Sequence, residues 1–251
     1  MKQREKLQTE KPCVFTVLSP MLYETLQRKR PYISVIVDIL RATTTICTAV
    51  YYGAEIIPVV SLKQVAEYKT RGYLVAGERL EKGLEMADFG NSAFEFMNSK
   101  IKGLEIVHSS TNGTKAMMKA LEHKAREIII ASFGNIDAVA EYLVMQNSDV
   151  EIVCAGWRGN FCLEDTLFAG ALTQKLLQKD FITEDDATNM ALSLWQESQN
   201  DIWATLRNAK HIHKLRKHHL DDVFDYTFTF NTCPVVPKLF CENNVWKILK
   251  V

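Results

Sequence analysis

The stretch at 34–45, SVIVDILRATTT, decides the fold expected for this chain. Its first four residues are mostly apolar and β-branched and too few for a helix, so they predict a strand buried on both faces of a sheet. Asp38 ends this strand, at the position where open α/β folds collect ligand groups. Arg41 and the threonines at 43–45 follow, where the hydroxyls and free N–H groups of a first helical turn suit an anion. The same residues also fit a plain alternative, an aspartate cap before a threonine-rich helix.

A strand, a small or polar turn and a helix follow one another five times along the chain. After the first strand, further strands of this kind are expected at 73–77, 104–109, 127–131 and 150–156, besides strands at 13–19 and 55–60. Such alternation predicts an α/β fold with three layers, α/β/α, around a mixed, mostly parallel sheet, built as one body or two lobes. Right-handed crossovers would place all the polar turns at one edge of the sheet.

These turns predict a pocket for an anion and a cation. Its lining would be Asp38, Glu78, Asn112, Asn135 and either Glu164 or Asp165. Carboxylates hold a hard cation such as Mg²⁺, while arginines and N–H groups take the charge of a phosphate, so these residue types indicate phosphoryl chemistry. Asp38 does not begin the DxDx motif of haloacid dehalogenases, and the Walker and HExxH spacings are absent from the sequence.

Composition limits the partners and the compartment. The 251 residues are 47% hydrophobic, and 30 basic side chains balance 30 acidic ones. A neutral balance argues against nucleic acid, so the anion site must be local and its ligand a small molecule. No run approaches the roughly 18 apolar residues of a membrane span. We expect a soluble, unprocessed, cytoplasmic protein with a flexible N-terminus at 1–12 and one α/β domain at 13–251, including a helical segment at about 183–219.

Cysteines and histidines give weaker signals. The six cysteines are scattered without a CxxC pair, which indicates reduced thiols rather than disulfides or a zinc site. The histidines at 211, 213, 218 and 219 invite a metal interpretation, but HIH and HH do not give the spacing of two ligands on one helix face. We therefore favour a surface or structural role for His211, His213, His218 and His219.

Seven short motifs carry a resemblance to a known family. In chain order they are VDILRATTT at 37–45, GER at 77–79, FGNS at 89–92, STNGT at 110–114, SFGN at 132–135, CAG at 154–156 and LED at 163–165. Taken together, over roughly residues 13–240, they make the chain resemble the 2-phosphosulfolactate phosphatases. The resemblance implies a Mg²⁺-dependent hydrolase that converts 2-phospho-3-sulfolactate to 3-sulfolactate and phosphate, a step in coenzyme M synthesis.

With this resemblance, we expect particular roles for the residues of the turns. Asp38, Arg41 and Glu78 would be catalytic, and Asp38, Glu78 and Asp165 would hold Mg²⁺. Phosphate would contact Thr43, Thr44, Arg79, Thr111, Asn112, Gly113 and Thr114, and the rest of the substrate Asn91, Ser92, Asn135 and Arg158. The sequence leaves open whether water attacks phosphorus directly or Asp38 is phosphorylated first.

Departures from the family pattern keep alternatives open. LEKGLEMADFGNSA at 80–93 replaces the family's glycine-rich stretch and GFDLGNSP loop, and Ser110 stands where a second threonine is common. A phosphatase for another 2-phospho-hydroxyacid, such as phospholactate, is one alternative. A non-catalytic module that binds an anionic metabolite is another, although it would not need three acids beside the anion site. A homodimer is expected only because two-fold assemblies are common.

Overall fold

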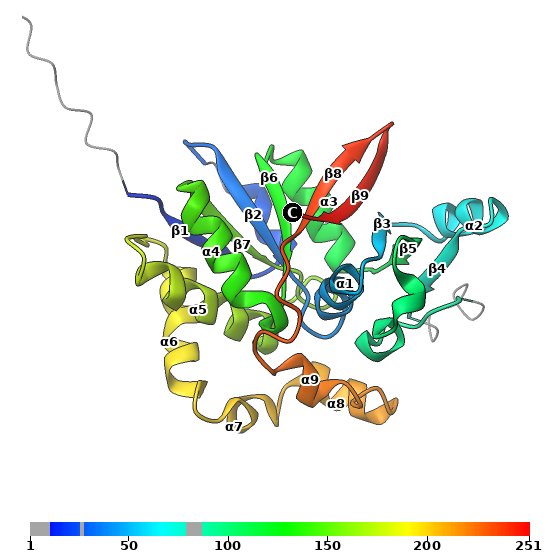
Figure 1. The fold of residues 1–251 in the computed structure, drawn as a ribbon. Coiled ribbons are helices and arrows are strands. Elements are labelled where there is room, and N and C mark those ends of the chain that lie inside the picture. Colours follow the sequence, from blue (N-terminus) through cyan, green and yellow to red (C-terminus); the bar gives the residue numbers. More distant parts are fainter. Residues whose placement is uncertain (1–10, 26–27, 79–86) are drawn as a thin grey trace, which may run out of the picture.

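The computed structural model describes residues 11–25, 28–78 and 87–251. Within them, nine strands form one sheet in the order β1-β7-β2-β6-β8-β9-β3-β5-β4 (Figure 1). The strands are β1 (Val14–Val17), β2 (Tyr32–Val37), β3 (Glu55–Val59), β4 (Leu74–Gly77), β5 (Glu105–Ser109), β6 (Glu127–Ala131), β7 (Asp149–Cys154), β8 (Pro237–Glu242) and β9 (Val245–Lys250). No helix in these ranges is both long and apolar enough to cross a bilayer.

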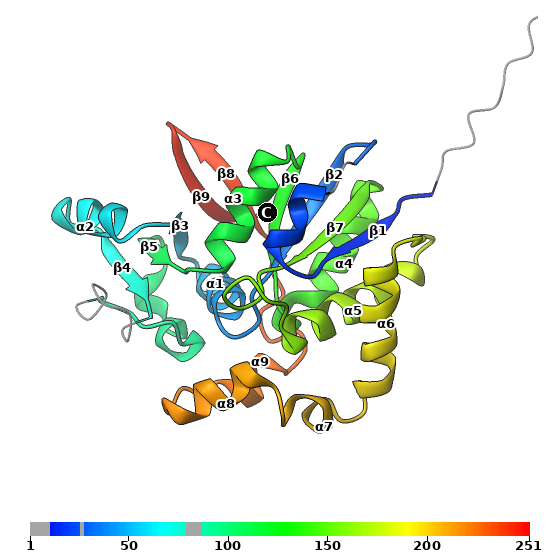
Figure 2. The same cartoon turned by 180° about the vertical axis from the view of Figure 1, so that it is seen from behind.

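Helices cover both faces of the sheet. They are α1 (Ala42–Tyr51), α2 (Leu62–Thr70), α3 (Gly113–Glu122), α4 (Ile136–Gln146), α5 (Leu163–Leu177), α6 (Asp186–Ser198), α7 (Ile202–Leu206), α8 (Lys210–Lys217) and α9 (Phe224–Thr227). Short 3-10 turns lie at η1 (Pro20–Thr25), η2 (Ala93–Phe96), η3 (Ser99–Ile101) and η4 (Phe133–Asn135). α4 lies in front of the sheet in Figure 1, and α3 lies in front of it in the reverse view of Figure 2. The expected three-layer α/β/α fold is confirmed.

Strand β2 shows how the sequence makes these layers. All six of its residues are buried. Ile33, Val35 and Val37 belong to a core with side chains of α4 and α5, whereas Ile36 belongs to a second core with side chains of α1 and α3. Because successive side chains of a strand point to opposite faces, an unbroken apolar run fits only a strand covered on both sides.

The sheet differs from the expected single parallel edge. β1, β7, β2 and β6 are parallel to one another, and so are β3, β5 and β4. The antiparallel hairpin β8–β9 joins the two groups, pairing with β6 on one side and with β3 on the other. The two groups therefore run in opposite senses along the sheet. Twist accumulates from strand to strand, so polar turns of both groups can still meet, although not along one straight edge.

The local structure also differs from the expectation at η2 and β8, and it gives an outcome for Pro58. The sequence at 90–92, Gly-Asn-Ser, predicts the start of a helix, but only the 3-10 turn η2 follows it. β8 was not expected, because its sequence PKLFCE starts with proline. In the structure only its first and third residues are buried. Pro58 predicts an edge or an end position for its part of the strand. It lies at the next-to-last position of β3, an interior strand, so the end position is the one observed.

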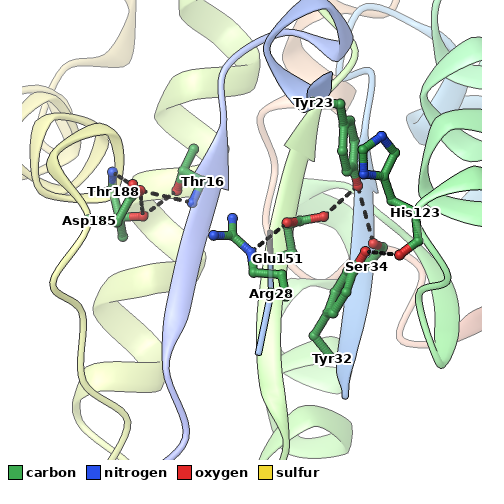
Figure 3. A network of polar contacts seen from close by, with 9 residues as sticks. All are labelled: Thr16, Tyr23, Arg28, Tyr32, Ser34, His123, Glu151, Asp185 and Thr188. Atoms are coloured by element: carbon green, nitrogen blue, oxygen red, sulfur yellow. Dashed lines mark hydrogen bonds and ion pairs between the residues drawn. The ribbon is translucent and has the colours of Figure 1, made fainter. Parts of the chain in front are cut away.

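A buried glutamate connects β7 to its neighbours (Figure 3). Glu151 is 1% exposed in the middle of this apolar strand. Its carboxylate accepts hydrogen bonds from the Tyr23 hydroxyl and, at 2.8 Å, from Arg28 Nε. The Tyr23 oxygen also lies 3.4 Å from the hydroxyl of Ser34 on β2. A buried charge is tolerated only when it is paired and hydrogen-bonded, so this network fixes η1 against the sheet.

Replacing Glu151 by alanine should destabilise the fold strongly, because the change leaves buried donors without their acceptor. We expect a loss of about 3–5 kcal/mol in the free energy of unfolding, measured by urea denaturation. Tyr23→Phe should cost about 1–3 kcal/mol. The exposed Glu141→Ala is the matched control, with an expected change of no more than about 0.5 kcal/mol. A loss at Glu151 as small as that of the control would contradict this account.

Candidate active site

A pocket of about 160 Å³ collects residues that follow β2, β4, β5 and β7, together with residues of α8. Its lining is Asp38, Leu40, Arg41, Glu78, Asn91, Ser109, Ser110, Thr111, Asn112, Trp157, Arg158, His211, Lys214 and Leu215. In Figure 1, α8 lies below the sheet, on the side where the carboxyl ends of β2, β6 and β7 lie. The two halves of the sheet and the helical segment therefore all contribute to one concave site.

Asp38 is buried at the end of β2, where the chain turns into α1. Its N–H donates to Thr43 Oγ1 at 3.1 Å, and its carbonyl accepts from the Thr43 N–H at 2.9 Å. Its carboxylate accepts from the backbone N–H groups of Ala42 and Gly113. Burial raises the pKa of this carboxyl to about 6, although His211 and the two N–H groups act in the opposite direction. The threonine-rich turn thus holds a buried carboxylate whose charge is only partly compensated.

The first turn of α3 lies directly against Asp38. A Cβ atom added to Gly113 would lie 3.1 Å from Asp38 Oδ2 and 3.1 Å from Ser110 Oγ, so only glycine leaves this approach open. The Gly113 N–H also donates to Ser110 Oγ at 3.1 Å. The side chain of Asn112 precedes the helix without capping it. The N-terminus of α3 therefore presents a positive dipole end to the pocket.

Cations surround the pocket. Arg41, whose side chain is only 4% exposed, forms an ion pair with Glu78. The guanidinium of Arg158 and the ammonium of Lys214 lie 4.9 and 5.1 Å from the centre of the Trp157 ring. Trp157 is thus a platform that holds two pocket cations by cation–π contact.

A buried acid–imidazole pair attaches α8 to α5. His211 Nδ1 lies 2.6 Å from Glu164 Oε1, and Glu164 is 1% exposed. The His211 ring also stacks on Trp157, with ring centres 5.8 Å apart and an angle of 15° between the planes. His213, His218 and His219 are exposed, as expected. His211 has the structural one of the two roles expected for these histidines, because it pairs with the buried Glu164.

Asp165 connects two turns of the site through the backbone. Its Oδ1 accepts from the Ile39 N–H and its Oδ2 from the Gly156 N–H, both at 2.9 Å. Burial, and then the neighbouring acids Glu164 and Asp38, raise the pKa of Asp165 well above its usual value. Both oxygens of this carboxylate thus hold the turns after β2 and β7 in place.

The structure brings together many of the expected site residues. Those that line the pocket are Asp38, Arg41, Glu78, Asn91, Thr111, Asn112 and Arg158. Thr114, in the first turn of α3, is fully buried with a hydroxyl that has no hydrogen-bond partner within the described ranges. The Ser92 hydroxyl lies outside the lining, 3.4 Å from an Asp222 carboxylate oxygen. Arg79 falls outside the described residues.

Three of the expected ligand residues, Thr43, Thr44 and Asn135, lie outside the pocket lining and hydrogen-bond within the fold. The hydroxyl of Thr43 accepts from Asp38, and that of Thr44 donates to the Ile39 carbonyl at 2.9 Å. The Asn135 amide donates to the carbonyls of Ile130 and Val235 at 3.2 and 2.9 Å, and its oxygen accepts from the Ser132 N–H. None of the three lines the pocket.

The expected magnesium ligands are not assembled as a cluster. Among the described residues, one group of three cysteine, histidine or acidic side chains has its ligand atoms within 4.8 Å of one another, and it is Cys162, Glu164 and His211. Of the expected set, only Asp38 and Glu78 line the pocket. Glu164 and His211 were missed as partners because nothing in the spacing of α5 and α8 along the sequence shows that they meet.

Comparison with known proteins gives the family of this chain. The family model described as "2-phosphosulpholactate phosphatase" matches residues 20–241. This chain belongs to the 2-phosphosulpholactate phosphatase family. The resemblance of the seven motifs is therefore confirmed.

Individual relatives agree with the family model. A "Probable 2-phosphosulfolactate phosphatase" of Caldanaerobacter subterraneus is 34% identical over 210 residues, which cover 82% of this chain and 86% of the relative. A protein of the same name from Thermotoga maritima is 35% identical over 207 residues, covering 82% and 88%. Another from Synechococcus sp. is 38% identical over 201 residues, covering 76% and 82%. The name of the family describes hydrolysis of a phosphoric monoester.

A buried histidine supports the pocket residue Asn91 and should make stability depend on pH. His108 Nε2 lies 3.2 Å from Asn91 Oδ1, and burial lowers the pKa of His108 to about 4. The unfolded chain binds a proton near pH 6.5, so the stability that this histidine contributes above that pH is lost as the pH falls toward 4. Between about pH 7.5 and 5, wild type should lose about 2 kcal/mol more than His108→Gln in urea unfolding. Equal pH dependence of the two proteins would contradict the neutral buried histidine.

Gly113→Ala should reduce turnover while the fold survives, because the new methyl group would displace Asp38 and Ser110. Misplacement of a reacting group by a fraction of an ångström to 1 Å can cost up to about 100-fold, and we expect a loss of kcat of about 10- to 100-fold. Phosphate release and thermal unfolding measured together test this. Lys115→Ala, an exposed change in the same helix, should leave kcat unchanged. Unchanged kcat in Gly113→Ala would show that Asp38 is not part of the reacting machinery.

Proposed function

We propose that this protein is a Mg²⁺-dependent phosphatase that hydrolyses 2-phospho-3-sulfolactate to 3-sulfolactate and phosphate, as in coenzyme M synthesis. The observation that carries the proposal is the lining of one pocket by the carboxylate of Asp38 and the cations Arg41, Arg158 and Lys214. Family membership supplies the reaction class.

The charges of the pocket suit this substrate. Phosphosulfolactate carries a phosphate, a carboxylate and a sulfonate. The chain as a whole has a formal net charge of zero, so its attraction for such a molecule must come from a local group of cations. Arg158 and Lys214 are held beside Trp157, while Arg41 is already paired with Glu78. We assign the phosphate to the N-terminus of α3 and the carboxylate or sulfonate to Arg158 and Lys214.

Asp38 fits a magnesium ion better than the other two expected ligands. Mg²⁺ takes one or two carboxylates and completes its shell with water and phosphate oxygens. Asp38 lines the pocket and has its negative charge buried. Glu78 is engaged by Arg41, and both Asp165 oxygens are engaged by backbone N–H groups. When bound, Mg²⁺ would neutralise charge on the transferring phosphoryl group.

The protein's own residues would then orient the substrate. The N–H groups at the start of α3 and the hydroxyl of Ser110 can donate to phosphate oxygens, as helix N-termini do in other anion sites. Asn91, held by His108, adds a fixed amide to the same pocket. Such fixed donors stabilise charge without reorganising during the reaction.

The test is phosphate release from racemic 2-phospho-3-sulfolactate and from 2-phospholactate, each with Mg²⁺ and with EDTA. We expect release that needs the metal and favours the sulfonate. Asp38→Asn should lower kcat by about 100-fold or more, because the variant would lose several kcal/mol of transition-state stabilisation. Arg158→Ala should raise KM by about 10-fold or more, because the substrate would lose a charge-assisted hydrogen bond. Arg71→Ala, which changes an exposed arginine, is the matched control and should leave KM unchanged.

Each other outcome has a definite meaning. A preference for phospholactate would keep the reaction and replace the substrate. Full turnover of Asp38→Asn would overturn the assignment of Asp38. No release from either compound, with binding of phosphate compounds retained, would indicate an anion-binding module without catalytic activity.

A further inference from the structure

Cys162, Glu164 and His211 meet behind the pocket, in a second cavity. Cys162 immediately precedes α5, Glu164 is in its first turn, and His211 is the second residue of α8. Their ligand atoms lie within 4.8 Å of one another. All three line a cavity of about 350 Å³, which also borders Trp157. Two helices distant in sequence therefore bring a thiol, a carboxylate and an imidazole to one point.

One atom of this group has no partner. Glu164 is 1% exposed, and its Oε1 lies 2.6 Å from His211 Nδ1. Its Oε2 is buried without a hydrogen-bond partner within the described ranges. The Cys162 thiol also interacts with Glu164. A buried carboxylate oxygen without a well-placed hydrogen bond is still costly, so Oε2 favours a further partner. The buried carboxylates of Asp38 and Asp165 lie close enough to influence the same group, so the missing partner should be positive.

The kinds of ligand atom decide which cation fits. Sulfur, imidazole nitrogen and carboxylate oxygen together are the ligands of zinc and related transition metals, whereas Mg²⁺ prefers oxygen alone. In a tetrahedral site with bonds of about 2.0–2.3 Å, ligand atoms lie roughly 3.3–3.7 Å apart. In this structure the ligand atoms lie within 4.8 Å of one another, and His211 Nδ1 and Glu164 Oε1, now 2.6 Å apart, would have to separate to bind one ion. A coordinating thiol would lose its proton to solvent and bind the metal as the thiolate.

We propose that Cys162, Glu164 and His211 bind a divalent transition-metal ion of the zinc class, at a site distinct from the magnesium position assigned to Asp38. The three side chains supply three ligands, and the cavity leaves a fourth position for water or a ligand atom. His211 and Trp157 line both this cavity and the substrate pocket. The ion would therefore fix α8, which carries Lys214, against α5. The inference does not depend on the proposed substrate.

Cobalt binding tests the proposal directly. The full-length protein, freed of metal with a chelator, is titrated with Co²⁺, which reports its ligands through its absorption spectrum. We expect one equivalent to bind with tetrahedral visible bands and a sulfur-to-cobalt charge-transfer band in the near ultraviolet. Zn²⁺ should displace the cobalt and raise the unfolding temperature, as any ligand selective for the folded state does. Mg²⁺ in excess should do neither.

Variants identify the ligands. Cys162→Ser should abolish the charge-transfer band. Both Cys162→Ser and His211→Gln should weaken Co²⁺ binding by at least ~10-fold, because loss of even a residue that only contacts a metal ligand lowers metal affinity by about that factor. Cys241→Ser, which removes an exposed thiol, and His213→Gln, which removes an exposed imidazole, should leave the spectrum unchanged. Far-ultraviolet circular dichroism of each variant checks that it is folded.

The opposite results would overturn the inference. A wild-type spectrum without a charge-transfer band would exclude Cys162 as a ligand whatever the variants do. Binding that survives Cys162→Ser but is lost in His218→Gln or His219→Gln would indicate chelation by the exposed histidines. Magnesium-dependent phosphate release with no cobalt site would overturn this inference alone, and a cobalt site without phosphate release would overturn the proposed function alone.

Discussion

The buried carboxylate of Asp38 is the constraint around which the site is built. It lies at the junction of β2, α1 and α3, where 7% of the residue is exposed, and its charge must be compensated there. Backbone N–H groups of Ala42 and Gly113 supply part of the compensation. They can do so only because Thr43 closes the turn and because Gly113 has no side chain. The carboxylate therefore dictates the threonines before α1 and the glycine at the start of α3.

The same constraint extends to the next layer of residues. Asp165 accepts from the N–H of Ile39, the residue after Asp38, and so sets where the turn after β2 lies. Its neighbour Glu164 pairs with His211 and so sets where α8 lies. Two consecutive acids of α5 thus hold the opposite walls of the pocket. Burying three carboxylates near one another is unfavourable unless cations join them, and this is the physical basis of the metal ions proposed above.

Sequence patterns predicted the parts of this structure that depend on local chemistry. β2, α1 and the turn before α3 all follow from apolar runs, caps and turn residues. Patterns failed where distant segments decide the outcome. Nothing local shows that β8–β9 separates two parallel groups, that Asn135 bonds to Val235, or that His211 meets Glu164. Seven of the predicted site residues line the pocket, whereas Thr43 and Thr44 show that a hydroxyl-rich turn can serve its own backbone.

The central place of the β8–β9 hairpin has a consequence for how the chain acquires its structure. These two strands come last of the nine along the chain, yet they lie between β6 and β3 in the middle of the sheet. Until they emerge from the ribosome, each parallel group has an open edge that can pair with another chain. The sheet therefore cannot close during early synthesis, and its slow, long-range final step exposes the protein to aggregation. Placing the latest strands at the centre thus lengthens the time during which open sheet edges are exposed.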